Sequence, residues 1–74
     1  MNERTEGTIQ RLNPTYGFIR DQRGKDYFFL PKEVTGDYEF GQLKVGWQVS
    51  FEIEEHPRGQ RARQVEIQRV TAGA

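Results

Sequence analysis

The sequence predicts an all-β fold, a small closed barrel built from five short strands. Three observations support it: apolar and aromatic residues alternate in short runs, turn-forming residues separate these runs, and no segment keeps a helical period over a useful length. The 74 residues are predicted to form a single domain over 1–74, with a core over about 5–70. Closing the sheet hides the edges that an open five-stranded sheet would expose to aggregation.

Turn signals separate the first three strands. These strands are predicted at residues 6–12, 16–20 and 26–30. Asn13-Pro14-Thr15 ends the first strand, because proline has no N–H to donate to a sheet ladder. A turn cluster at 21–24 ends the second strand, and Pro31 ends the third.

The second half holds one long irregular connection, 32–46, and two more strands. Residues 48–54 alternate: the members predicted to point inward are Val49, Phe51 and Ile53, and those predicted outward are Ser50, Glu52 and Glu54. A turn is expected at 56–59, followed by a last strand that carries Ala62, Val65 and Ile67. Residues 71–74 are expected to fray.

The predicted core consists of modest apolar side chains from all five strands and the connection. Its members are Ile9, Ile19, Tyr27, Phe29, Val34, Leu43, Val49, Phe51, Ile53, Val65 and Ile67. Trp47 has the parity of Val49 and Phe51, so it is predicted to be a lid on this core.

Aromatic residues occur on both faces of the second and third predicted strands. Tyr16 and Phe18 share one face, and Phe28 is out of phase with Tyr27 and Phe29. A domain this small cannot bury rings on both sides of one sheet, so the outer rings need a use. Stacking on unpaired nucleic-acid bases is that use.

The composition argues against several other functions. There is no cysteine and one histidine, and neither a glycine-rich phosphate loop nor a carboxylate cluster with metal spacing is present, so we expect no enzyme, catalytic residue, metal or cofactor. We also expect no small-molecule substrate. No apolar run approaches the roughly 20 residues of a membrane span, and the expected location is cytoplasmic.

Charge is balanced overall but unevenly spread. Eleven basic residues match eleven acidic ones, which counts against a generic phosphate-binding protein. Residues 34–55 hold one lysine and five acids, whereas residues 56–74 hold four arginines and one acid. In the last strand, Arg61 and Arg63 either extend a positive strip or only offset the acids at 52–55.

Over residues 6–67 the sequence resembles the bacterial cold shock proteins. The motifs that carry this resemblance are Gly7-Thr8-Ile9, Tyr16-Gly17-Phe18-Ile19, Asp26-Tyr27-Phe28-Phe29, Val49-Ser50-Phe51-Glu52 and Arg58-Gly59, all in register. The resemblance implies a five-stranded antiparallel oligonucleotide-binding (OB-fold) barrel that binds single-stranded RNA or DNA with little sequence preference.

The chain departs from that family at the binding surface. Arg11-Leu12 stands where the family has Trp-Phe, Leu30-Pro31 where it has His-Phe, and the loop before Tyr16 is two residues short and lacks Lys-Gly. Losing one stacking ring costs about 1–3 kcal/mol, so we expect weaker and more salt-sensitive binding than in a typical member. Arg11 offers partial compensation, because its planar head can both stack and carry charge.

The predicted nucleic-acid-binding residues are Arg11, Tyr16, Phe18, Lys25, Asp26, Phe28, Phe40 and Arg58. For several of them a plainer interpretation stays open: an ion pair for Arg11, a core anchor for Phe40 and simple solvation for Arg58. The same holds for Tyr16, Phe18 and Phe28, which could simply pack against the long connection at 32–46. Two functions remain, a single-strand binder acting as an RNA chaperone, and a barrel that has lost most of its platform and serves as a protein-interaction module. A monomer is expected, with a strand-exchanged dimer as the alternative.

Overall fold

The computed structural model describes residues 4–36 and 38–69, and within them the fold is all β. The strands are β1 (Thr5–Leu12), β2 (Gly17–Asp21), β3 (Asp26–Phe29), β4 (Val34–Thr35), β5 (Gln48–His56) and β6 (Gly59–Arg69). Two short 3-10 turns, η1 (Pro31–Glu33) and η2 (Phe40–Gln42), lie in the long connection. The predicted strand positions are confirmed, β4 being a two-residue addition, whereas the frayed tail at 71–74 lies outside the described residues.

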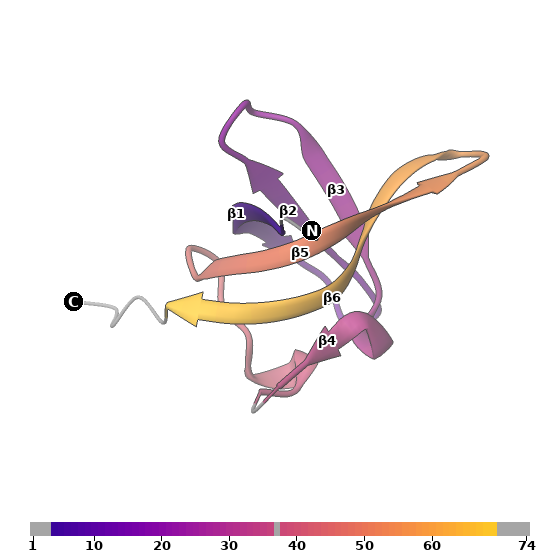
Figure 1. The fold of residues 1–74 in the computed structure, drawn as a ribbon. Helices are drawn as coiled ribbons and strands as arrows, with labels where there is room; N and C mark the ends of the chain where they lie inside the picture. Colours follow the sequence, from indigo (N-terminus) through magenta and orange to yellow (C-terminus); the bar gives the residue numbers. More distant parts are fainter. Residues whose placement is uncertain (1–3, 37, 70–74) are drawn as a thin grey trace.

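The strands close into a barrel in the order β3-β2-β1-β5-β6-β4, with a further pairing of β3 and β6 across the seam. The pairings along β3-β2-β1-β5-β6 are antiparallel, as expected. The seam is different, because β3 and β4 both pair with β6 in parallel. Figure 1 shows the β5–β6 hairpin extending beyond the other strands, with β4 lying beside β6.

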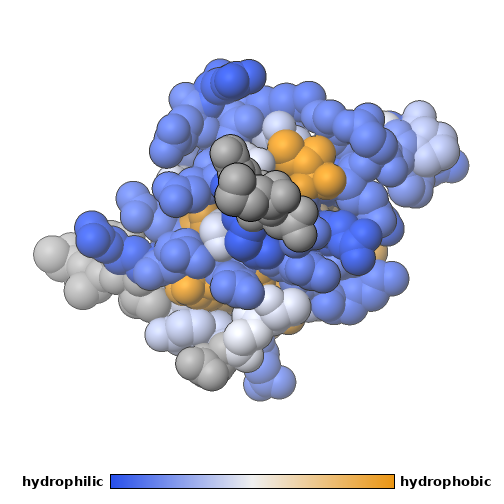
Figure 2. All heavy atoms as spheres, viewed as in Figure 1, coloured by the Kyte–Doolittle hydropathy of each residue, from blue (hydrophilic) through white to orange (hydrophobic). Residues whose placement is uncertain are grey.

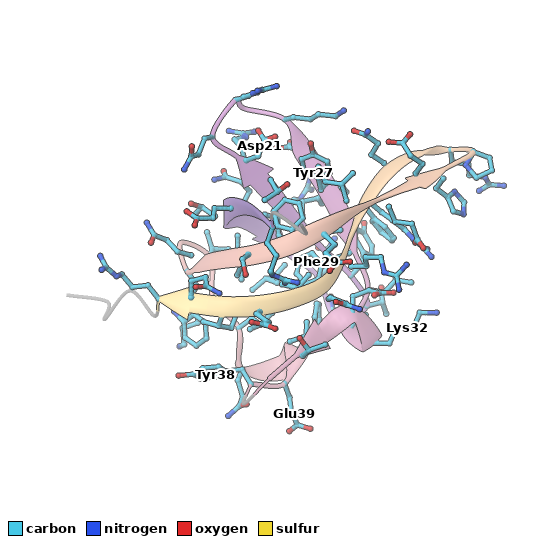
Figure 3. All side chains as sticks on the ribbon, viewed as in Figure 1. Asp21, Tyr27, Phe29, Lys32, Tyr38 and Glu39 are labelled. Carbon is cyan, nitrogen blue, oxygen red and sulfur yellow. The ribbon has the colours of Figure 1, made fainter. Side chains whose placement is uncertain are left out.

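The buried core agrees with the prediction at most positions. Its members are Ile9, Ile19, Tyr27, Phe29, Leu43, Trp47, Val49, Phe51, Ala62 and Val65, and Val34 and Ile67 pack against it half-buried. Figure 3 labels Phe29 within the barrel. Trp47 is buried at 7% exposure, as expected of a lid, and its ring meets the Tyr38 ring edge-on at 5.3 Å.

The inward prediction for Ile53 is wrong, since this side chain is exposed. The pairing of β1 with β5 ends at Thr5 opposite Phe51, two residues before Ile53. Ile53 therefore lies where the β5–β6 hairpin extends past β1, and β1 does not cover it. The surface in Figure 2 is largely hydrophilic, with only small separate hydrophobic areas.

Ser50 is predicted to point outward, and the structure shows that it is nevertheless buried, at 4% exposure. Its hydroxyl accepts hydrogen bonds from Arg4 Nε at 3.0 Å and Gln68 Nε2 at 2.8 Å. These two long side chains cover Ser50, and they also satisfy its polar atom, so its burial leaves no unpaired group.

A bulge in β6 lies opposite this part of β5. Ser50 pairs with Glu66 and Glu52 with Arg63, so two residues of β6, Gln64 and Val65, face one of β5. Gln64 has φ of 50°, the left-handed conformation of a bulge. The bulge explains how Ala62 and Val65, three residues apart, both reach the core.

Candidate nucleic-acid interface

Three aromatic rings on the outside of β2 and β3 contact one another. Phe18 and Phe28 are cross-strand partners, with ring centroids 5.9 Å apart. Tyr16, just before β2, lies 5.7 Å from Phe18 and 5.4 Å from Phe28. All three are partly exposed, and none belongs to the hydrophobic core cluster. We call these three residues the outer ring cluster.

Gly17 leaves room on the inner face of β2 for the ring of Phe29. A Cβ on Gly17 would lie 2.7 Å from Cε1 of the Phe29 ring. The bare glycine therefore lets Phe29 pack beneath β2 while Tyr16 and Phe18, on either side of it, stay on the outer face.

A bulge in β1 places Arg11 beside this cluster. Ile9 pairs with Ile19 and Arg11 with Phe18, so Gln10 is an extra residue in β1. Without the bulge, alternation from buried Ile9 would turn Arg11 inward. Arg11 is instead exposed on the face of Phe18, and the described residues offer its side chain neither an ion pair nor a hydrogen bond. The plainer interpretation of Arg11 as part of a surface ion pair finds no support.

Asp26 lies on the same outer face but is already paired. Its carboxylate accepts from Arg20 Nε at 2.8 Å and Arg20 Nη2 at 3.4 Å, across the β2–β3 ladder. These hydrogen bonds hold the pKa of Asp26 below its usual value. Any base amino group that approached Asp26 would share the carboxylate with Arg20, a residue that the sequence reasoning missed although it has the parity of Phe18.

Lys25 contacts the β5–β6 hairpin, and Arg58 lies at its tip. The Lys25 ammonium hydrogen-bonds the Gln60 side chain and sits 5.5 Å from the Tyr27 ring centroid. Arg58 is at the tip of the β5–β6 hairpin, where its N–H donates to His56 Nδ1 at 3.3 Å. A hollow beside it is lined by Phe28, His56, Arg58, Gly59, Gln60 and Arg61.

Phe40 is the one predicted aromatic that lies apart from the outer ring cluster. It is half-buried in η2, and its ring meets that of Phe29 edge-on at 5.8 Å. It packs against the hydrophobic core cluster, so the geometry supports its interpretation as a core anchor.

Two arginines of the last strand, Arg61 and Arg63, share one carboxylate of β5. Arg61 Nε donates to Glu54 Oε1 at 2.7 Å, and Arg63 Nη1 donates to Glu54 Oε2 at 3.1 Å. The hydrogen bond from Arg61 is the main reason that the pKa of Glu54 lies below its usual value. These arginines offset acids of β5, which was one of the two readings left open by the sequence.

Within 4–36 and 38–69 no group of three or more histidine, aspartate or glutamate residues is arranged to hold a metal ion. The same part of the chain contains no helix long and apolar enough to cross a membrane.

Comparison with known proteins identifies a family and a fold for the chain. Residues 5–68 match the family model described as the 'Cold-shock' DNA-binding domain. The chain is similar to the Cold shock-like protein CspE of Bacillus anthracis, with 42% identity over 50 residues, which is 68% of this chain and 73% of that relative. A solved structure titled drosophila Unr CSD456 shares the fold, with TM-score 0.77 and 22% identity over 99% of this chain. The chain spans 30% of the length of that solved chain.

Proposed function

The chain belongs to the cold shock domain family, whose members bind single-stranded nucleic acids, and we propose that it binds single-stranded RNA or DNA through the outer ring cluster with low sequence preference. The observation that supports this is the mutual contact of Tyr16, Phe18 and Phe28 outside the core. Every base has a π-face, so rings of this kind accept any sequence, at about 1–3 kcal/mol per stacked base.

The cluster predicts modest affinity. Three stacked bases contribute about 3–9 kcal/mol before the cost of ordering the strand, which corresponds to roughly micromolar binding. Arg11 adds a cation next to Phe18, and Arg58 adds another near Phe28. Because the chain has zero net charge, these local cations have to supply the phosphate contacts.

The role that fits such binding is that of an RNA chaperone or a regulator of transcription or translation. A protein that stacks on exposed bases blocks their re-pairing. Modest affinity lets it release the strand quickly without ATP.

An NMR titration with short oligothymidine and oligouridine tests this proposal. We expect shifts confined to residues 11–30 and 58–63, and we expect Phe18→Ala to abolish them at micromolar oligonucleotide, because loss of one ring weakens binding about 5- to 150-fold. Val45→Ala is the control, because Val45 is an exposed apolar residue at 60% exposure outside the cluster. Shifts spread over the whole barrel, or unchanged in Phe18→Ala, would contradict the proposal.

A protein-interaction module is the second candidate. The zero net charge and the apolar Leu30-Pro31 pair after β3 favour it. The same titration separates the two functions, since a barrel that does not bind nucleic acid shows no shifts even at millimolar oligonucleotide.

A further inference from the structure

One row of residues crosses five strands on the outer face of the barrel. Its members, from β1 through β2, β3 and β6 to β5, are Arg11, Phe18, Phe28, Arg61 and Glu54. Each is the direct strand partner of the next, and partners across a sheet project to the same face. The row continues over the β3–β6 seam, so an arginine flanks the two rings on either side.

The two flanking arginines differ in their surroundings. Arg11 is exposed and, among the described residues, has no acid bonded to its side chain. Arg61 lines the hollow beside Phe28, but its Nε is held by Glu54 Oε1 at 2.7 Å. The side chains of Arg61 and Glu54 are 27% and 30% exposed, so solvent and a ligand can reach the pair.

Resting on the function proposed above, we propose that Arg61 is a further nucleic-acid contact and that Glu54 competes with the nucleic acid for it. A phosphate and a carboxylate present the same pair of acceptor oxygens to a guanidinium, so one can replace the other. A strand that stacks on Phe28 brings its phosphates next to the neighbouring residue of the row, which is Arg61.

Arg63 makes such an exchange feasible. Glu54 binds the two arginines through different oxygens, Arg61 at Oε1 and Arg63 at Oε2. When a phosphate takes Arg61, Glu54 keeps Arg63 as a counter-ion. The carboxylate then repels the incoming phosphate less than an unpaired acid would.

Removing Arg61 is the first half of the test, with binding measured by fluorescence anisotropy of a labelled oligothymidine at several salt concentrations. We expect Arg61→Gln to weaken binding about three- to tenfold at low salt and to lower the steepness of the salt dependence by about 0.7. Arg69→Gln is the matched control, because it removes the same charge from an exposed residue at the other end of β6. We expect it to change the affinity by less than twofold.

Removing Glu54, the proposed competitor for Arg61, is the second half of the test. We expect Glu54→Gln to tighten binding about two- to fivefold, the range in which exposed ion pairs act. Glu66→Gln changes the net charge equally, at an exposed acid of β6 outside the row, and we expect little gain from it. A gain in affinity cannot come from a misfolded variant, so this half does not depend on the stability of Arg61→Gln.

The inference is overturned if Arg61→Gln matches Arg69→Gln, or if Glu54→Gln binds no better than Glu66→Gln. Phe18→Ala is measured in the same series. If Phe18→Ala weakens binding and Arg61→Gln does not, only the inference fails. If Phe18→Ala also binds normally, the proposed function itself is wrong.

Discussion

The two faces of β2 and β3 carry aromatic rings in very different surroundings. On the inner face Tyr27 and Phe29 are 4% and 0% exposed, and their rings contact Phe51 and Phe40 at 5.1 and 5.8 Å. On the outer face Phe18 and Phe28 remain partly exposed, and their ring contacts are with each other and Tyr16. A single step along a strand therefore separates a ring that stabilises the fold from one available to a ligand.

The largest expected effect is a difference in stability between two variants, each of which truncates one ring on one of the two faces. Phe29→Ala leaves a cavity in the centre of the core and should lower the free energy of unfolding by about 3–5 kcal/mol. Phe28→Ala, one residue away, removes a partly exposed ring whose aromatic contacts are with Tyr16 and Phe18, and should cost about 1 kcal/mol. Urea unfolding measures both. Equal losses in the two variants would mean that the outer rings are part of the core and would remove the distinction between the faces.

Gly17→Ala should have an intermediate effect on stability, because the added methyl group on β2 would collide with the inner-face ring of Phe29. The added Cβ would lie 2.7 and 2.8 Å from two atoms of the Phe29 ring, which is fully buried. We expect a loss of about 1–3 kcal/mol in the free energy of unfolding. Gly41→Ala is the control, since a Cβ there meets no atom within 4 Å. If both variants unfold at the same urea concentration, Gly17 does not separate the faces.

Strand positions and the division of rings could be predicted because alternation is a local property. Bulges depend on the partner strand, and the sequence did not predict them. The bulge at Gln10 turns Arg11 outward, and the bulge at Gln64 lets Val65 reach the core position that was predicted for it. The exposure of Ile53 depends on where β1 stops, which the pattern of β5 does not record.

The geometry of the candidate interface could be predicted in part for the same reason. Tyr16, Phe18 and Phe28 follow from parity within their own strands. The partners of Asp26 and Arg61 could not be predicted in this way. Arg20 is opposite Asp26 only in this register of β2 and β3. Phe28 meets Arg61 only across the parallel seam between β3 and β6. The sequence of one β-strand does not say which residues of another strand it will face. Closure of the whole barrel decides these pairings.

The smallest expected effect is a dependence of stability on pH, which arises at the turn that joins β2 and β3. Asp21 Oδ1 accepts from the N–H groups of Lys25 and Arg23, each at 2.9 Å, and Oδ2 accepts from the hydroxyl of the inner ring of Tyr27 at 3.2 Å. Figure 3 labels Asp21 and Tyr27 at this end of the barrel. The hydrogen bond from Lys25 is the main reason that the pKa of Asp21 lies below its usual value.

Because the pKa of Asp21 is lower in the folded than in the unfolded chain, its contribution to stability is present above the unfolded value of about 3.9 and is lost as the pH falls through the folded value. We expect the carboxyl carbon of Asp21 to titrate below pH 3.9 in an NMR experiment. Asp21→Asn should flatten the fall in urea midpoint between about pH 4 and pH 2. Glu66→Gln is the control, because it removes one exposed carboxylate whose side chain makes no hydrogen bond among the described residues. If Asp21 titrates at or above the unfolded value, the turn does not hold the carboxylate. The tyrosine on the inner face would then depend on packing alone, as Phe29 does.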